Sequence, residues 1–308
     1  MSKSGILSVI LTFVAARSLL AQAQSNPPSE SGFTLYAASQ LVVLRVGVQD
    51  SHGTNIKGLQ AGDFMIYENG HPQTIKQFAH EDRPVTLGIV MDASGSMRTK
   101  QAEVITAALA FVNSSNPEDQ TFVVTFNDHA ALGLPPGTPF SNDPREIKTA
   151  LFGRKPEGKT ALYDALVLAA DHLAKGKWEN KALLLISDGG DNNSTDTLDD
   201  AVRAVRMSGA AVYSIALFDP EDPEHNLGAL HRLSRDSGGE AFAPTELSEI
   251  GSLCLRIAAD IRASYTLAYT PPQPDEHSTW RKIKVVAHAH TGGKLIIHAR
   301  TGYLLPAQ

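Results

Sequence analysis

The sequence predicts an α/β fold, in which a doubly wound, mainly parallel sheet is flanked by a β module formed by the N- and C-terminal segments. Short continuous apolar runs, such as residues 85–91 and 182–187, alternate with helical patterns. This alternation is typical of parallel strands that helices cover on both faces. Strand patterns without intervening helices occupy residues 33–78 and return after residue 264. We therefore expect the two ends of the chain to pair with each other.

The α/β part is expected over residues 84–263. Its strands are predicted at residues 85–91, 122–126, 182–187, 211–217 and 240–242. Its helices are predicted at residues 100–113, 145–152, 161–174, 198–208, 227–237 and 246–263. In the first of these helices Val104, Ala107, Ala108 and Phe111 lie on one stripe, which is the period of an amphipathic helix.

The flanking β segments are expected over residues 33–83 and 264–308. Their strands are predicted at residues 41–48, 64–67, 265–269, 281–290 and 294–299. Asn69-Gly70 follows the second strand directly and predicts a tight hairpin, because both residue types tolerate a positive φ.

The N-terminus has the pattern of a signal peptide over residues 1–23, followed by a polar, proline-containing linker over residues 24–32. Lys3 precedes a nearly continuous apolar run, and Ala21-Gln22-Ala23 fits a small-x-small cleavage site. The run is too short to span a bilayer comfortably, and no other stretch is long and apolar enough. These features predict export to the periplasm, the cell surface or the medium.

Composition narrows the class of protein. With 308 residues, 42% of them hydrophobic, the chain has an ordinary globular composition and can bury a substantial core. A net charge of −6 gives no support to nucleic-acid binding, which usually needs a basic face. A single cysteine, Cys254, excludes an intrachain disulfide, and its apolar helical surroundings predict a buried thiol.

Five oxygen-bearing side chains lie at positions where a sheet of this type binds ligands. Asp92, Ser94 and Ser96 follow the first buried strand, and Asp188 follows another. The carboxyl ends of parallel strands meet at one edge, where the strand order reverses. Thr160 opens a predicted helix between them and is expected to join them. Two carboxylates and three hydroxyls suit Mg²⁺, with Mn²⁺ or Ca²⁺ as alternatives.

Asp92, Ser94, Ser96, Thr160 and Asp188 resemble the complete metal-ion-dependent adhesion site of von Willebrand factor type A (VWA) domains. The resemblance covers residues 85–245. The flanks are similar to a bacterial family of exported VWFA-related proteins, in Glu68-Asn69-Gly70, in residues 265–269 and in Gly302-Tyr303. The resemblance implies a non-enzymatic adhesion module whose divalent cation coordinates an Asp or Glu of a protein partner.

Two alternatives remain open. Residues 153–160 satisfy Gly-x4-Gly-Lys-Thr, the phosphate-binding loop of NTPases. Such a loop must follow a buried strand, whereas Asp143 and Pro144 predict a preceding helix. The other alternative is a structural VWA module in which the metal has no role and the β segments contact the partner.

Overall fold

The structure is a computed structural model that describes residues 41–80, 82–217, 226–272, 280–289 and 293–304. The predicted signal peptide, the predicted linker and the first residues of the N-terminal β segment lie outside these ranges. Within them, no helix combines the length and the apolar character needed to cross a membrane.

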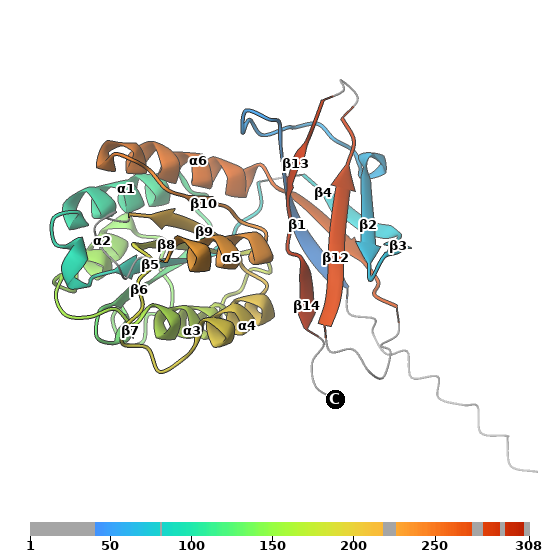
Figure 1. The fold of residues 1–308 in the computed structure, drawn as a ribbon. Helices are drawn as coiled ribbons and strands as arrows, with labels where there is room; N and C mark the ends of the chain where they lie inside the picture. Colours follow the sequence, from blue (N-terminus) through green and yellow to red (C-terminus); the bar gives the residue numbers. More distant parts are fainter. Residues whose placement is uncertain (1–40, 81, 218–225, 273–279, 290–292, 305–308) are drawn as a thin grey trace, which may run out of the picture. The chain divides into compact units, whose positions relative to one another are not determined.

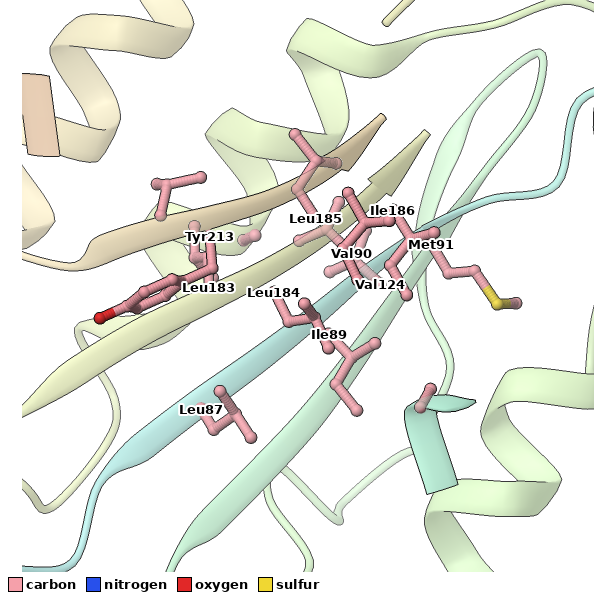
Figure 2. Close-up of a cluster of buried hydrophobic side chains, with 14 of the residues drawn as sticks. Leu87, Ile89, Val90, Met91, Val124, Leu183, Leu184, Leu185, Ile186 and Tyr213 are labelled. Atoms are coloured by element: carbon pink, nitrogen blue, oxygen red, sulfur yellow. The ribbon is translucent and has the colours of Figure 1, made fainter. Parts of the chain in front are cut away.

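A six-stranded sheet in the order β10-β9-β8-β5-β6-β7 forms the centre of the α/β part. Its strands are β5 (Thr86–Asp92), β6 (Gln120–Phe126), β7 (Ala130–Leu132), β8 (Lys181–Ser187), β9 (Ala211–Ala216) and β10 (Ala241–Phe242). All neighbouring strands are parallel except the edge strand β7. Every residue of β5 is buried, and side chains of β5, β6, β8 and β9 form one apolar cluster (Figure 2). The predicted fold class is confirmed.

Six α-helices cover this sheet (Figure 1). They are α1 (Gln101–Ser114), α2 (Pro144–Phe152), α3 (Leu162–Leu173), α4 (Leu198–Ser208), α5 (Leu227–Ser237) and α6 (Ile250–Arg262). α1 packs against α6, and α3 packs against α4, on opposite faces of the sheet. Cys254 in α6 is fully buried as predicted, and burial raises the pKa of its thiol to about 12.

The two ends of the chain pair with each other in two antiparallel sheets, as predicted. One sheet contains β13 (Ile296–His298), β1 (Val42–Gln49), β11 (Tyr265–Tyr269) and β4 (Ile75–Ala79) in that order. The other contains β14 (Gly302–Leu304), β12 (Trp280–Ala287), β2 (Phe64–Glu68) and β3 (His71–Gln73). Alternate residues of β1, including Leu44 and Val46, enter a core shared with Ile66 of β2. We call these eight strands the β module.

The predicted hairpin between β2 and β3 is confirmed. Asn69 has φ 49° and Gly70 has φ 86°, and Glu68 pairs with His71 across the two-residue turn. Both turn residues therefore occupy the left-handed region that Asn-Gly tolerates.

Some predicted boundaries are wrong. The predicted strand over residues 281–290 covers Trp280–Ala287, and beyond it the His288 N–H still donates to the Asp63 carbonyl at 2.9 Å; residue 290 lies outside the described residues. The predicted strand over residues 294–299 is shorter, covering only Ile296–His298. Short edge strands such as β7 have no recognisable period, so the sequence did not predict them.

Candidate metal centre

Asp92 is the last residue of β5, and its carboxylate is held in place from two sides. Its Oδ1 accepts the backbone N–H of Ser94 at 2.8 Å, and its Oδ2 accepts the Ser187 hydroxyl at 2.7 Å. β5 and β8 are parallel neighbours, so Ser187 at the end of β8 lies beside Asp92. Both residues are fully buried. The carboxylate is therefore fixed in a buried position at the edge of the sheet, which we call the floor of the site.

Three more of the predicted ligands meet above this floor. The hydroxyl oxygens of Ser94 and Ser96 lie 3.1 Å apart, and the Ser96 hydroxyl donates to Oδ2 of Asp188 at 2.6 Å. Asp188 directly follows β8, and its Oδ1 accepts the Gly190 N–H at 3.1 Å. Hydrogen bonds thus link Ser94, Ser96 and Asp188 into a chain beside Asp92.

Thr160 lies on a neighbouring loop that is attached to the same turn. The Gly95 N–H donates to the Gly158 carbonyl at 3.2 Å, and the Glu157 N–H donates to the Ala93 carbonyl at 3.0 Å. Thr160 itself is 7% exposed. In the part of the chain that the structure describes, no hydrogen bond joins its hydroxyl to the other four side chains.

Thr160 does not cap the helix that follows it. α3 begins at Leu162, and a distant loop caps it instead. Asp191 Oδ1 accepts the Leu162 N–H at 2.8 Å, and the Ser194 hydroxyl accepts the Tyr163 N–H at 3.0 Å. The Thr160 N–H donates to the side-chain oxygen of Asn192 at 3.0 Å, so the same loop also positions Thr160.

Sequence analysis missed these supporting residues. The polar run after Asp188 contains the acceptor types that cap helices, in Asp191, Asn192 and Ser194. Capping residues normally directly precede their helix, whereas this loop follows α3 by about the length of one strand and one turn. The sequence shows these residue types, but it does not show which helix they cap.

The electrostatics of the site favour a bound cation. Burial and, to a smaller extent, the nearby Asp188 carboxylate raise the pKa of Asp92 to about 7, although hydrogen bonds from Ser94 and Ser187 oppose the rise. Two carboxylates close together repel each other, and one of them tends to take up a proton. A divalent cation between them would remove that repulsion.

The donor set fits a hard cation. Adjacent ligands of an octahedral Mg²⁺ ion, bound at about 2.1 Å, lie ~3 Å apart. The Ser94–Ser96 and Ser96–Asp188 oxygen separations are 3.1 and 2.6 Å. No group of three or more His, Cys, Asp or Glu residues that could hold a metal occurs within the described ranges. Any cation here would therefore depend on hydroxyl ligands as well as the two carboxylates.

The NTPase alternative does not fit the structure. Residues 153–160 follow helix α2, whereas a phosphate-binding loop follows a buried strand. Oδ1 of Asp128 accepts the Lys159 N–H at 2.9 Å, and the same carboxylate lies so close to Gly158 that an added Cβ would collide with it. A carboxylate thus occupies the position where this loop would need to accept phosphate.

Residues 87–190 match the family model described as the von Willebrand factor type A domain. Together with the doubly wound sheet, this match shows that the α/β part of the chain has a VWA-type fold. The chain is 31% identical over 119 residues to the uncharacterized protein sll0103 of Synechocystis sp.. That alignment covers 38% of this chain and only 28% of the relative.

Two solved structures share the fold. One is a von Willebrand factor type A protein from Catenulispora acidiphila, with 15% identity and a TM-score of 0.50. The match covers 86% of this chain and 75% of that protein. The other is proximal thread matrix protein 1 from the mussel byssus, with 17% identity and a TM-score of 0.51, covering 63% and 51%. At these identities the similarity concerns the fold alone.

Proposed function

We propose that this chain is a metal-dependent protein-binding module. In this proposal Asp92, Ser94, Ser96, Thr160 and Asp188 hold a divalent cation, most suitably Mg²⁺, directly or through water. An Asp or Glu side chain of a protein partner then completes the coordination shell. The cation supplies Lewis acidity toward that carboxylate, and the chain supplies its position. A VWA domain supports a role as a protein-interaction module, and no catalytic step is needed.

One observation carries this proposal: the side chains at the inner side of the site are buried, whereas its outer side is exposed to solvent. Asp92 and Ser187 are fully buried, whereas Gly95 and Ser96 are exposed. With only two anionic ligands, a dication would keep its attraction for a further carboxylate. A partner's side chain can reach such an ion from the solvent side without any rearrangement of the sheet.

The surroundings of the site suit an acidic partner. The loop over residues 153–160 runs beside Gly95 and carries exposed Lys155 and Lys159, and Arg98 is exposed three residues after Gly95. The net charge of the chain is −6. A basic rim on an acidic protein attracts a negatively charged segment and speeds its approach.

The test is Mg²⁺ titration by calorimetry, followed by capture of partners from the exported proteome with Mg²⁺ or with EDTA. We expect Asp92→Ala to abolish both Mg²⁺ binding and Mg²⁺-dependent capture. Asp171→Ala is the matched control, because Asp171 is an exposed aspartate in α3. Capture that persists in EDTA and in Asp92→Ala would show that the metal mechanism is wrong.

In the structural alternative, the β module contacts the partner. Deletion of residues 33–83 would not be a clean test of this alternative. β1, β2 and β4 pair with strands from the C-terminal segment, so that deletion would leave β11 without partners and β12 paired with β14 alone. Surface substitutions such as Met65→Lys, at a residue that is 40% exposed, are the suitable probe. Loss of EDTA-resistant capture in that variant would support the structural alternative.

We also propose that the chain is exported, as the pattern of residues 1–23 predicts. N-terminal sequencing of the protein recovered outside the cytoplasm tests this. A mature chain that begins near residue 24 is expected. Recovery of the intact N-terminus only from the cytoplasm would contradict it.

A further inference from the structure

A cavity of about 280 Å³ lies between the β module and the VWA domain. Val43 and Arg45 of β1 line one side, and Lys181 and Ala211, the first residues of β8 and β9, line another. The candidate metal centre lies at the opposite, carboxyl ends of the same parallel strands. The two sites are therefore separate.

Two arginines, Arg45 and Arg300, line this cavity. Arg45 donates to the Ile261 carbonyl at 2.6 Å and to the Ser264 hydroxyl at 2.8 Å. Arg300 donates to the Val43 carbonyl at 2.9 Å. All of these acceptors are uncharged. Within the described ranges neither guanidinium forms an ion pair, and Nη1 of Arg45 and Nε of Arg300 are buried without a hydrogen-bond partner.

Two other arginines of the chain, the half-buried Arg206 and the buried Arg281, show what is missing here. Arg206 lies 2.8 Å from the carboxylate of Asp236, and Arg281 lies 3.0 Å from that of Glu68. A guanidinium does not lose its charge in proteins, so its burial without a counter-ion is unfavourable. Burial lowers the pKa of both Arg45 and Arg300, which is the same cost expressed as proton affinity.

The other charged groups of the cavity do not supply the missing anion. Glu179 and Lys181 both line it, and Glu179 is exposed. Glu179 acts on Lys181, where it opposes the fall in the lysine pKa that burial causes. These two charges offset each other. Asp119, which does not line the cavity, partly opposes the fall in the Arg45 pKa, but it forms no ion pair with Arg45 in the described part of the chain.

We propose that this cavity binds a small oxyanion, a phosphate or a small carboxylate, between Arg45 and Arg300. A guanidinium binds both kinds of oxyanion through charge-assisted hydrogen bonds, and Nη1 of Arg45 and Nε of Arg300 are the donors still without a partner among the described residues. The volume is at the lower end of small-molecule sites, which suits an anion of a few heavy atoms. The bound anion neutralises two charges at the junction, so it stabilises the attachment of the β module to the VWA domain.

The experiment measures the melting temperature of the whole chain against inorganic phosphate, citrate or acetate. EDTA is present throughout, so that no cation at the metal centre can take the anion. Ionic strength is kept constant with chloride. We expect phosphate, citrate or both to raise the Tm by about 2–4 °C at saturation, above any change in chloride alone. The arms with phosphate and with carboxylates identify which oxyanion the site prefers.

Two variants test whether the anion-dependent rise in Tm arises at this cavity. Arg300→Gln removes one charge and is expected to lose the anion-dependent rise. Met207→Glu keeps both arginines, since Met207 is 71% exposed at the cavity and a glutamate there supplies an internal anion. It is expected to lose the rise while starting from a Tm equal to or above that of the natural chain. A glutamate near the C-terminus of α4 is unfavourable for the helix itself, so a gain would come from the arginines.

Met207→Gln and Arg203→Gln are the controls. Met207→Gln changes the same position without adding a charge, and Arg203→Gln removes an exposed arginine of the same helix. Both should keep the full rise. The proposal is overturned if no anion raises the Tm of the natural chain above chloride, or if Met207→Glu retains the rise. These outcomes do not depend on whether the metal centre binds Mg²⁺.

Discussion

The buried hydroxyl of Ser187 donates to Oδ2 of Asp92 at 2.7 Å, so a residue of β8 holds the carboxylate that ends β5. The same hydroxyl oxygen accepts the Gly189 N–H at 3.0 Å. Ser187 is not among the proposed ligands, yet it orients one of them and the backbone that follows Asp188. Groups that orient metal ligands affect affinity nearly as strongly as the ligands themselves.

Ser187→Ala is therefore expected to weaken Mg²⁺ binding by about 10-fold or more, because Asp92 loses its lateral hydrogen bond. The fold should persist, at a cost of about 1–3 kcal/mol in the free energy of unfolding. Calorimetric titration and urea unfolding measure the two effects. Ser214→Ala is the control, since Ser214 is a fully buried serine of β9 that bonds Ser234 at 2.9 Å. Equal Mg²⁺ affinity in the natural chain and in Ser187→Ala would contradict the orienting role.

Asp191→Ala tests whether the loop after β8 positions Thr160. Loss of the acceptor at the start of α3 should cost about 1 kcal/mol of stability, as removal of a helix cap usually does. Mg²⁺ affinity should fall as well, since the loop that holds Thr160 loosens. Thr197→Ala removes the side chain that caps α4, so it should cost similar stability while leaving Mg²⁺ affinity unchanged. If both variants bind Mg²⁺ like the natural chain, Thr160 needs no support from this loop.

Glu68→Ala should strongly destabilise the β module. The Glu68 carboxylate is buried and accepts from Arg281 at 3.0 Å, Tyr269 at 2.5 Å and Tyr303 at 3.1 Å. Its removal leaves the Arg281 charge buried without this partner, which costs about 3–5 kcal/mol. Tyr303→Phe removes one hydrogen bond only and should cost about 1 kcal/mol. Urea unfolding ranks the two; a Glu68→Ala cost no larger than that of Tyr303→Phe would refute this account.

The raised pKa of Asp119 makes the stability of the folded chain depend on pH. Burial raises the pKa of Asp119 to about 6, although it accepts the N–H groups of Val85 at 2.7 Å and Asn116 at 3.1 Å. The folded chain therefore holds this proton more tightly than the unfolded chain, whose aspartates titrate near pH ~3.9. The contribution of Asp119 to stability is complete below pH ~3.9 and is lost as the pH rises through about 6.

Asp119→Asn should remove this loss. Between pH 4 and pH 7 the free energy of unfolding of the variant should rise relative to that of the natural chain by on the order of 1 kcal/mol, a value reduced for partial screening by water. Urea unfolding across this pH range measures it. The exposed Asp171→Asn serves as the control and should leave the pH profile unchanged. A profile of Asp119→Asn parallel to that of the natural chain would rule out the raised pKa.

The positions of Asp92 and Asp188 were predictable because they follow apolar runs that only a buried parallel strand explains. The sheet then brings both residues to one edge, whatever the details of the loops. The pairing of β1 with β11 was predictable for a similar reason, since strands at both ends of the chain need partners.

The loop contacts and the junction cavity were not predictable. Asp191 caps a helix that precedes it in the chain, and Arg45 and Arg300 line the same cavity although they are 255 positions apart in the sequence. Neither relationship leaves a period or a spacing in the sequence, because each depends on how finished elements pack. The sequence shows that Arg45 is an arginine in a strand, but only the fold shows that it forms no ion pair with any residue that the structure describes.

The antiparallel strands contributed by both ends of the chain also constrain the order in which the protein matures. During synthesis β1 and β2 emerge early, but β11 and β12 follow about 200 residues later. The VWA sheet has all of its strands before then, whereas the early strands expose unpaired edges that invite pairing with other chains. Until β11 and β12 have been synthesised, the nascent polypeptide carries these open edges, and a chain released before that point never covers them.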